Sequence, residues 1–388
     1  MSRINDLIKE LCPNGVEYKL LKDVSEMKRG QSITKKNLKI GKIPVIAGGQ
    51  EPSFYNDKYN SEGETITVSS SGAYAGFLNY WNEPILCTDS FSIKAKKLNM
   101  RYLYHYLKMK QNEIYNKKRG AGIPHVHISD LEKFKIPIPP IKVQEEIVRI
   151  LDKFGEIEAE LEAELEARKS QYEFWHKKIF DNSNGKVIKL SDLCIIGDGL
   201  HGTPHYVDES EYYFINGNNL NNGKITYDNK TKKVSKTDFD NQSILLNDNT
   251  LLMSINGTIG KVSYYNNEKI MLGKSVAYFN IKDKNRLSKK YLYYLLQSPN
   301  SIKYYQDSLT GSTILNLGLK SLREFEVQIP SIDEQNRVAN ILERFDKLIN
   351  DITVGIPAEI ELRRKQYEYY RNKLLSFEEL YYEWFIRW

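Results

Sequence analysis

The stretch Ile136–Phe180 occurs twice in this chain, and this repeat limits the possible folds more than any other feature. Up to Phe154 the matching residues return 191 positions later, so that Phe154 corresponds to Phe345. From Gln171 onward the spacing is 195 positions, and Gln171 corresponds to Gln366. The difference of four residues is about one helical turn. The same helix face therefore continues in both copies.

Apolar residues of the first copy recur every three or four positions, which is the spacing of one face of an α-helix. They are Ile147, Ile150, Leu151, Phe154, Ile157, Leu161, Leu165, Tyr172, Trp175 and Ile179. Positions 142–180 contain no proline and one glycine, Gly155, so we expect a continuous helix of roughly 60 Å. Such an apolar stripe needs a partner in water, and the second copy is the obvious one. We predict an intramolecular antiparallel coiled coil. Two separate core helices would explain the stripe but not the repeat.

The second copy contains Gly355-Ile356-Pro357, a combination that ends one helix and begins another, so we expect that copy to be split there. Residues 4–11 also have helical spacing, and they end at Cys12-Pro13-Asn14-Gly15 much as the first copy ends at Asp181–Gly185. The repeat is therefore circular, and we expect the two termini to approach each other. For the aromatic tail, residues 378–388, we expect a last helical turn packed on the helices.

Two globular modules alternate with the helical copies and share one plan. Thr65–Gly72 in the first module corresponds to Thr250–Gly257 in the second, and Tyr102–Tyr106 corresponds to Tyr291–Leu295. The predicted fold class is mixed α/β (α+β), with two pseudo-symmetric globular domains separated by two long antiparallel coiled-coil helices and circularly repeated. The predicted boundaries are 1–14 (helix packing with the C-terminal helical region), 15–141 (first module), 142–184 (central helical spacer), 185–332 (second module), 333–377 (distal helical spacer) and 378–388 (tail).

Composition adds weaker limits. The chain has 388 residues, a net charge of +6 and a pI near 8.8, which slightly favours a polyanionic partner. No apolar run approaches the ~20 residues that a membrane-spanning helix needs, and the start lacks a signal-peptide pattern, so we expect a cytoplasmic protein. The isolated Cys12, Cys87 and Cys194 fit neither a disulfide framework nor a zinc site.

No catalytic constellation emerges from the sequence. Gly197–Gly202 satisfies the spacing of a dinucleotide fingerprint, but Pro204 and the polar run that follows do not predict the helix that this site requires. Gly273-Lys274-Ser275 resembles the end of a phosphate-binding loop, yet position 268 is Glu where the loop needs Gly. The pairs His125/His127 and His201/His205 could each bind a metal, but histidines in solvated loops are the commoner case. We therefore predict no catalytic residue and no metal site.

Several segments together resemble the specificity subunits of type I restriction–modification systems, over nearly the whole chain. They are Leu11–Tyr18, Thr67–Gly76, Asp89–Ile93, Ile138–Pro140, Gln144–Val148, Gly355–Glu361 and Gln366–Arg371. The resemblance implies that the two modules are target-recognition domains, each reading one half of a bipartite double-stranded DNA site. It implies that the helical spacers set the gap and dock two methyltransferase (modification) subunits, which restriction (translocase) subunits join. S-adenosylmethionine, ATP and Mg would then be bound by the partner subunits, and none by this chain.

Side chains with donors, acceptors or positive charge on the module loops are the candidate DNA contacts. In the first module they are Lys35, Lys36, Gln50, Tyr55, Ser70, Tyr74, Lys118, Arg119 and His125. In the second they are His201, His205, Asn216, Asn218, Asn219, Lys232, Lys233, Asn256, Lys261, Ser312 and Thr313. The candidate partner contacts on the helices are Gln144, Glu145, Arg149, Gln171, Tyr172, Gln335, Arg337, Gln366 and Tyr367.

The first helical copy contains a tandem tetrapeptide, Ala159–Glu162 followed by Ala163–Glu166. One more unit would lengthen a helix by about 6 Å, so we hypothesise that the copy number sets the gap between half-sites. Two other functions remain open. The chain could be a coiled-coil adaptor with two protein-binding heads, or an autonomous methyltransferase that transfers methyl groups without partners.

Overall fold

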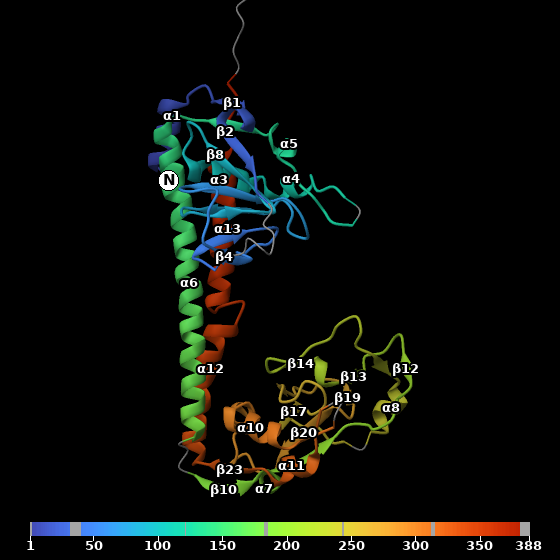
Figure 1. Cartoon of the computed structure of the whole chain (residues 1–388). Coiled ribbons are helices and arrows are strands. Elements are labelled where there is room, and N and C mark those ends of the chain that lie inside the picture. Colours follow the sequence, from blue (N-terminus) through green and yellow to red (C-terminus); the bar gives the residue numbers. More distant parts are fainter. Residues whose placement is uncertain are drawn as a thin grey trace, which may run out of the picture. The chain divides into compact units, whose positions relative to one another are not determined.

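The computed structural model describes residues 2–31, 40–120, 122–181, 185–242, 244–311 and 315–380. The chain forms two compact units (Figure 1). Unit 1 comprises residues 1–162 and 359–388, and unit 2 comprises residues 163–358. Unit 1 thus joins the two ends of the chain, as the circular repeat predicts.

Unit 1 is built on a four-stranded antiparallel sheet in the order β2-β8-β5-β6. All five residues of β5 are buried, as expected for a central strand rich in Thr, Ile and Val. In a second sheet of order β4-β3-β7, β3 runs parallel to β7, and β1 pairs with β9 where the chain enters and leaves the module. The strands are β1 (Glu17–Leu20), β2 (Ser25–Arg29), β3 (Ile43–Ile46), β4 (Phe54–Asn56), β5 (Thr65–Ser69), β6 (Leu78–Trp81), β7 (Leu86–Cys87), β8 (Ser90–Ala95) and β9 (Lys135–Ile138).

Helices cover this sheet and share one apolar core with it. Asn99 caps α3, because its side chain accepts a hydrogen bond from the Tyr102 backbone N–H at 3.0 Å. The buried Tyr102 and Leu103 of α3 then pack with Ile66 and Ile93 of the sheet. The helices are α1 (Ser2–Leu11), α2 (Leu21–Val24), α3 (Met100–Met109), α4 (Gln111–Tyr115), α5 (Ile128–Leu131), the first part of α6 (Ile141–Asp181) and most of α13 (Ile356–Leu375).

Unit 2 repeats this plan. Its main sheet has the order β11-β20-β17-β18, its second sheet contains the parallel pair β13 and β19, and β10 pairs with β23 as β1 pairs with β9. The strands are β10 (Lys186–Lys189), β11 (Cys194–Asp198), β12 (Tyr206–Val207), β13 (Tyr213–Ile215), β14 (Leu220–Asn221), β15 (Lys224–Ile225), β16 (Lys233–Val234), β17 (Thr250–Ser254), β18 (Val262–Tyr264), β19 (Ile270–Leu272), β20 (Val276–Ile281), β21 (Leu309–Thr310), β22 (Asn316–Leu317) and β23 (Glu326–Ile329). The helices are α7 (Leu190–Leu193), the 3-10 helix η2 (Gly217–Asn219), α8 (Lys236–Asp240), α9 (Lys289–Leu296), α10 (Pro299–Asp307), α11 (Leu319–Glu324), α12 (Ile332–Asn350) and the later part of α6.

The long helices pack antiparallel within each unit, which confirms the predicted fold class. In unit 1 the ring of Phe154 on α6 stacks on Tyr370 of α13 with centroids 5.5 Å apart. Arg364 of α13 also reaches Glu158 of α6 at 2.6 Å. In unit 2, Tyr172 of α6 contacts Phe345 of α12 with centroids 6.4 Å apart. The sequence repeat is thus also a repeat of side-chain contacts.

The predicted break in the second helical copy is confirmed. Helix α12 ends at Asn350 and α13 begins at Ile356. A Cβ on Gly355 would lie 2.5 Å from the Lys347 carbonyl oxygen, so only glycine fits there.

The N-terminal and C-terminal segments that the structure describes meet in unit 1, as predicted. Val16 forms a parallel bridge with Glu379, and the Leu380 N–H donates to the Val16 carbonyl at 2.9 Å. The expected last helical turn of the tail is wrong for residues 378–380, which are extended because they pair with Val16. The rest of the tail lies outside the described residues. Among the helices described here, none has the length and apolarity to cross a bilayer.

Candidate nucleic-acid interface

Three loops of unit 1 meet beyond one end of the main sheet: residues 47–50, residues 70–76 and a third loop described at 119–120 and 122–126. Backbone hydrogen bonds join the last two loops, because the Val126 N–H donates to Ser70 O at 3.0 Å and the Gly72 N–H donates to Pro124 O at 3.0 Å. Segments 70–72 and 124–126 thus form a short antiparallel ribbon, which we call the loop ribbon. Arg119 pairs with the outer side of the ribbon through two backbone hydrogen bonds to His125, of 2.7 and 3.0 Å.

Unit 2 has the same loop ribbon. The Leu317 N–H donates to Ile255 O at 2.9 Å, and the Gly257 N–H donates to Leu315 O at 3.1 Å. Segments 255–257 and 315–317 therefore correspond to 70–72 and 124–126. Strand β21 lies where Arg119 lies in unit 1, since Thr310 pairs with Asn316. The two ribbons share their hydrogen bonds but differ in their side chains.

Carboxylate, amide and hydroxyl side chains form hydrogen bonds that hold these loops. In unit 1, Asp89 accepts hydrogen bonds from the hydroxyls of Ser70, at 3.1 Å, and Ser71. In unit 2, the Ser275 hydroxyl accepts from the Gly217 N–H at 3.0 Å and donates to Asn216 Oδ1 at 3.2 Å. The loops are therefore held in place before any ligand arrives.

Most candidate DNA contacts of unit 1 lie on or beside these loops. Ser70 and His125 belong to the loop ribbon, and the Arg119 side chain is 71% exposed although it pairs with the buried Asp130. Tyr74 is exposed on loop 70–76, and the Lys118 amine donates to the Ala73 carbonyl at 3.2 Å. The remaining candidates are Gln50, exposed on the first loop, Tyr55, exposed on β4, and Lys35 and Lys36, which lie outside the described residues.

The candidates of unit 2 are more dispersed. Asn216, His201 and Asn256 line one groove of about 660 Å³, together with Lys274, Ser275 and Asn316. Asn219 is buried, and its amide bonds to Thr226 O, Thr231 Oγ1 and the Asn216 N–H inside its own loop. The other candidates are Asn218 and Lys232, both exposed, Lys233 over the Tyr213 ring, Lys261 bonded to Asn221, His205 beside Asp238, and Ser312 and Thr313, which lie outside the described residues.

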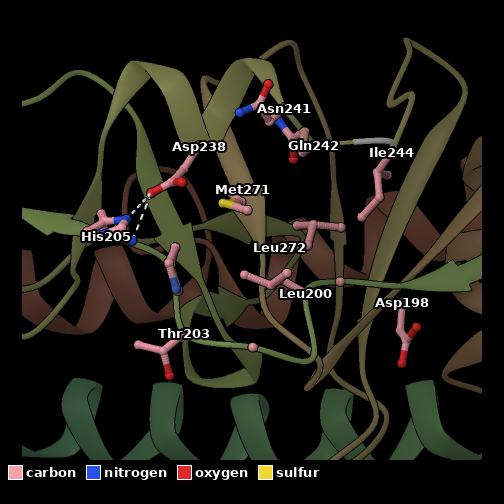
Figure 2. A pocket seen from close by; sticks show the side chains of 13 residues that line it. Asp198, Leu200, Thr203, His205, Asp238, Asn241, Gln242, Ile244, Met271 and Leu272 are labelled. Atoms are coloured by element: carbon pink, nitrogen blue, oxygen red, sulfur yellow. Dashed lines mark hydrogen bonds and ion pairs between the residues drawn. The ribbon is translucent and has the colours of Figure 1, made fainter.

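His205 lines a second pocket of unit 2, with a volume of about 420 Å³. Figure 2 shows His205 pointing to Asp238, whose carboxylate accepts the His205 backbone N–H at 2.7 Å, across from Leu200 and Met271. His201 has its own carboxylate, since its Nε2 lies 2.8 Å from Asp198. His201 and His205 therefore have different carboxylate neighbours. Within the ranges that the structure describes, no three His, Cys, Asp or Glu side chains converge as a metal site would require.

Five residues that belong to this site were not among the sequence candidates: Ser71, Asp89, Lys274, Ser275 and Asn316. The structure identifies them because they lie on or beside the loop ribbon or line the groove, and no sequence motif marks them. Their signal in the sequence is the correspondence between the modules, which aligns Ser71 with Asn256. At Gly197–Gly202 no helix begins, as the sequence predicted, because β11 is followed by an isolated bridge at Leu200 and by bends at His201 and Gly202.

Of the candidate partner contacts, Gln144 and Gln335 are buried and bonded within the fold. Gln144 accepts from the Asn99 N–H and donates to Pro139 O, and Gln335 accepts from the Ser288 N–H and donates to Pro330 O. Tyr172 and Tyr367 are half-buried in the helix pairs. The others lie on helix surfaces: Glu145, Arg149 paired with Glu146, Gln171 with Arg168, Arg337 with Glu334, and Gln366 with Arg363.

A buried polar cluster joins the unit 1 module to the helices. His105 of α3 contacts Asp152 of α6 at 2.7 Å and the Tyr367 hydroxyl of α13 at 3.0 Å. Burial lowers the pKa of His105, although its hydrogen bond to Asp152 acts in the opposite sense. Burial acts to raise the pKa of Asp152, but hydrogen bonds from His105 and Arg101 outweigh it and lower that pKa. The pair Arg101–Asp152 corresponds to Lys290–Glu343 in unit 2, so the link between module and helix is also repeated.

Two copies of one module, each with the same loop ribbon and different side chains, define a protein with two related recognition heads. The family model of the type I restriction modification DNA specificity domain matches residues 13–167 and 182–362. The chain belongs to this family. Its function is that of the DNA specificity subunit of a type I restriction–modification system, which is itself non-catalytic.

Relatives agree with this assignment, and solved structures share the fold. The specificity subunit of the Escherichia coli type I restriction enzyme EcoR124I/EcoR124II is 29% identical over 370 residues, which cover 83% of this chain and 88% of that protein. A Mycoplasma pneumoniae protein named as a type I specificity subunit is 30% identical over 63% of this chain and 94% of its own length. The S subunit from M. genitalium has the same fold, with a TM-score of 0.57 at 17% identity over 93% of this chain and 96% of that one. A chain from a structural study of type I complex assembly has a TM-score of 0.65 at 14% identity, over 94% of this chain and 98% of that one.

Proposed function

We propose that each head reads one half of a bipartite, asymmetric double-stranded DNA site. The observation that carries this proposal is the repeated loop ribbon, which has one backbone and two sets of side chains. In this scheme the recognition domains are residues 15–141 and 185–332, and the helical spacers are residues 142–184 and 333–377. Residues 1–14 complete the distal spacer, and residues 378–388 form a tail.

Within each head we assign two kinds of contact. Charged side chains at the edge of the loops, such as Arg119 and Lys274, are suited to phosphates, and neutral hydrogen-bonding groups on the ribbons are suited to base edges. This assignment keeps the candidate residues named above, except Asn219, as DNA contacts. It gives Asn219 the role of holding its loop, since all its bonds are internal.

The helices are proposed to dock two methyltransferase subunits, one for each copy of the repeated helix pair. We assign such contacts to the exposed candidates Glu145, Arg149, Gln171 and Arg337 and to the half-buried Gln366, whereas the buried candidates support the helix surface from within. Restriction subunits would join this core. S-adenosylmethionine, ATP and Mg would be bound by the partner subunits, and the complex would act in the cytoplasm.

The tandem tetrapeptide is proposed to set the gap between the half-sites. Helix α6 is continuous over 41 residues, and Ala159, Glu160, Ala163 and Glu164 are exposed on it. One further unit therefore has room in the helix and adds about 6 Å to its length.

The test is a domain exchange in the assembled complex. Residues 15–141 are replaced by the corresponding domain of another specificity subunit, and methylated bases are mapped by single-molecule sequencing. We expect one half-site to change and the other to stay. An adaptor with protein-binding heads would leave the site unaltered, and an autonomous methyltransferase would methylate DNA as the purified chain alone, so either result would refute the proposal.

A further inference from the structure

One pair of side chains stands out on each loop ribbon. In an antiparallel ribbon, residues directly opposite each other point to the same face, and successive pairs alternate between faces. Ile255 and Leu317 form one such pair in unit 2 and are buried in the core. The next pair, Asn256 and Asn316, must therefore point away from the core. Both line the groove described above.

The same position in unit 1 is occupied by Ser71 and His125. Val126 next to it is buried, and Ser71 pairs with His125 as Asn256 pairs with Asn316. The backbone hydrogen bonds join the residues before and after each pair, and the two residues of the pair do not bond to each other. In such a non-hydrogen-bonded pair of an antiparallel ladder the two side chains lie closest. Each head thus presents one close cross-strand pair on the outer face of its ribbon.

We propose that this cross-strand pair is the specificity-determining element of each head, and that Asn256 and Asn316 read an adenine in the half-site of unit 2. The inference rests on the proposed DNA-reading function and names the residues that perform it. Sequence is read by hydrogen bonds from side chains to base edges in a groove. The pair stands on the outer face of its ribbon, where its side chains can reach such an edge.

The chemistry of the pair favours adenine over the other bases. An amide carries one acceptor and one donor group, which match the N6 amino group and N7 of adenine. Asn256 Oδ1 is buried and accepts no hydrogen bond from the described residues, and its Nδ2 makes only a long bond of 3.4 Å to Lys274 O. The Asn316 side chain has no hydrogen bond to the part of the chain that the structure describes. The Asn316 amide is therefore available to a ligand as it stands, whereas the Asn256 amide must turn toward the groove before its buried Oδ1 can accept a hydrogen bond from a base.

The pair in unit 1 differs in chemistry, so the two heads should read different bases. The Ser71 hydroxyl donates to Asp89, whereas the His125 ring has no hydrogen bond to the described residues, so His125 is the group that is available to a base. The rings of His125 and His127 stack with centroids 6.1 Å apart and planes within 2° of each other. The two rings are therefore parallel neighbours beside the loop ribbon.

The test uses the chain assembled with its methyltransferase partners in a host, with methylated sites mapped by single-molecule sequencing. We expect Asn316→Ala to reduce discrimination at one adenine of one half-site by about 10- to 100-fold, the range that a good bidentate contact supplies. Asn316→Asp, which keeps the side-chain shape and replaces the donor with an acceptor, should shift the preference at that position toward cytosine. The matched control, His125→Ala, should relax only the other half-site.

Thermal unfolding and complex assembly of each variant show whether it folds, and the Asp variant keeps the test decisive if the Ala variant does not. Retention of the same half-site by folded, assembled Asn316→Asp would overturn the inference. A change in both half-sites would also overturn it. Failure of the proposed function itself would look different, because the wild-type complex would then show no bipartite methylation at all.

Discussion

Replacement of Gln335 by alanine should destabilise unit 2 strongly. This buried side chain donates from Nε2 to Arg286 O and Pro330 O, both at 2.9 Å, and accepts from the Ser288 N–H at 2.9 Å. It thereby ties the start of α12 to β23 and to the start of α9. At roughly 1 kcal/mol for each bond, the loss should reach about 3 kcal/mol. For a domain of this size, that corresponds to a fall in melting temperature of about 6–12 °C.

The assay is denaturant unfolding of the purified chain, with Gln306→Ala as the matched control. Gln306 is exposed on α10, so its replacement should change the unfolding free energy by less than about 0.5 kcal/mol. Equal stability of the two variants would refute the structural role of Gln335. Assembly with the methyltransferase subunits, measured where both variants are folded, separates this role from a partner contact. Loss of assembly by folded Gln335→Ala alone would place the side chain at the interface.

A second copy of Ala163–Glu166 inserted after position 166 should widen the gap between methylated half-sites by one to two base pairs, at about 6 Å per unit and ~3.4 Å per base pair, and an unchanged gap would refute the ruler. Gly355→Ala should lower the free energy of unfolding by about 1–3 kcal/mol, because the new Cβ would collide with three carbonyl oxygens. Gly155→Ala should raise it by about 0.5–1 kcal/mol, because a Cβ there meets nothing within 4 Å and alanine favours the helix. Calorimetry of the two variants would show whether the two changes have opposite signs. Burial lowers the pKa of His176, so neutral His176 contributes stability above the ordinary pKa near 6.5, and this contribution is lost as the pH falls through the lowered pKa. The His176→Phe variant should therefore lose less unfolding free energy than wild type between pH 7 and pH 5. Equal changes of unfolding free energy with pH in the two proteins would contradict this.

The helices and the repeat could be predicted because their signals are local and periodic. The spacing of Ile147, Leu151 and Phe154 predicts one face of α6, and Gly355 with Pro357 predicts the break between α12 and α13. The meeting of the termini follows from the circular order of the repeat. None of these predictions needed a contact between distant loops.

The site was harder to predict because it is made by loops far apart in the sequence. Ser71 meets His125, and Asn256 meets Asn316, through backbone hydrogen bonds that leave no pattern in either segment. Residue type alone selected Asn219 as a DNA contact, yet its amide is used inside its own loop. Residue type likewise selected Gln144, which is buried at the junction of α6 and α3.

The central claim is that the two heads are equivalent readers that differ only in their side chains. Its most direct test is a chain in which residues 185–332 are replaced by a second copy of residues 15–141, joined at the equivalent strand pairs β1–β9 and β10–β23. The measurement is the set of methylated sites produced by the complex of this chain with its partner subunits. We expect a site whose two halves are the same, each carrying the half-site of the first head. A site that kept two different halves would contradict it.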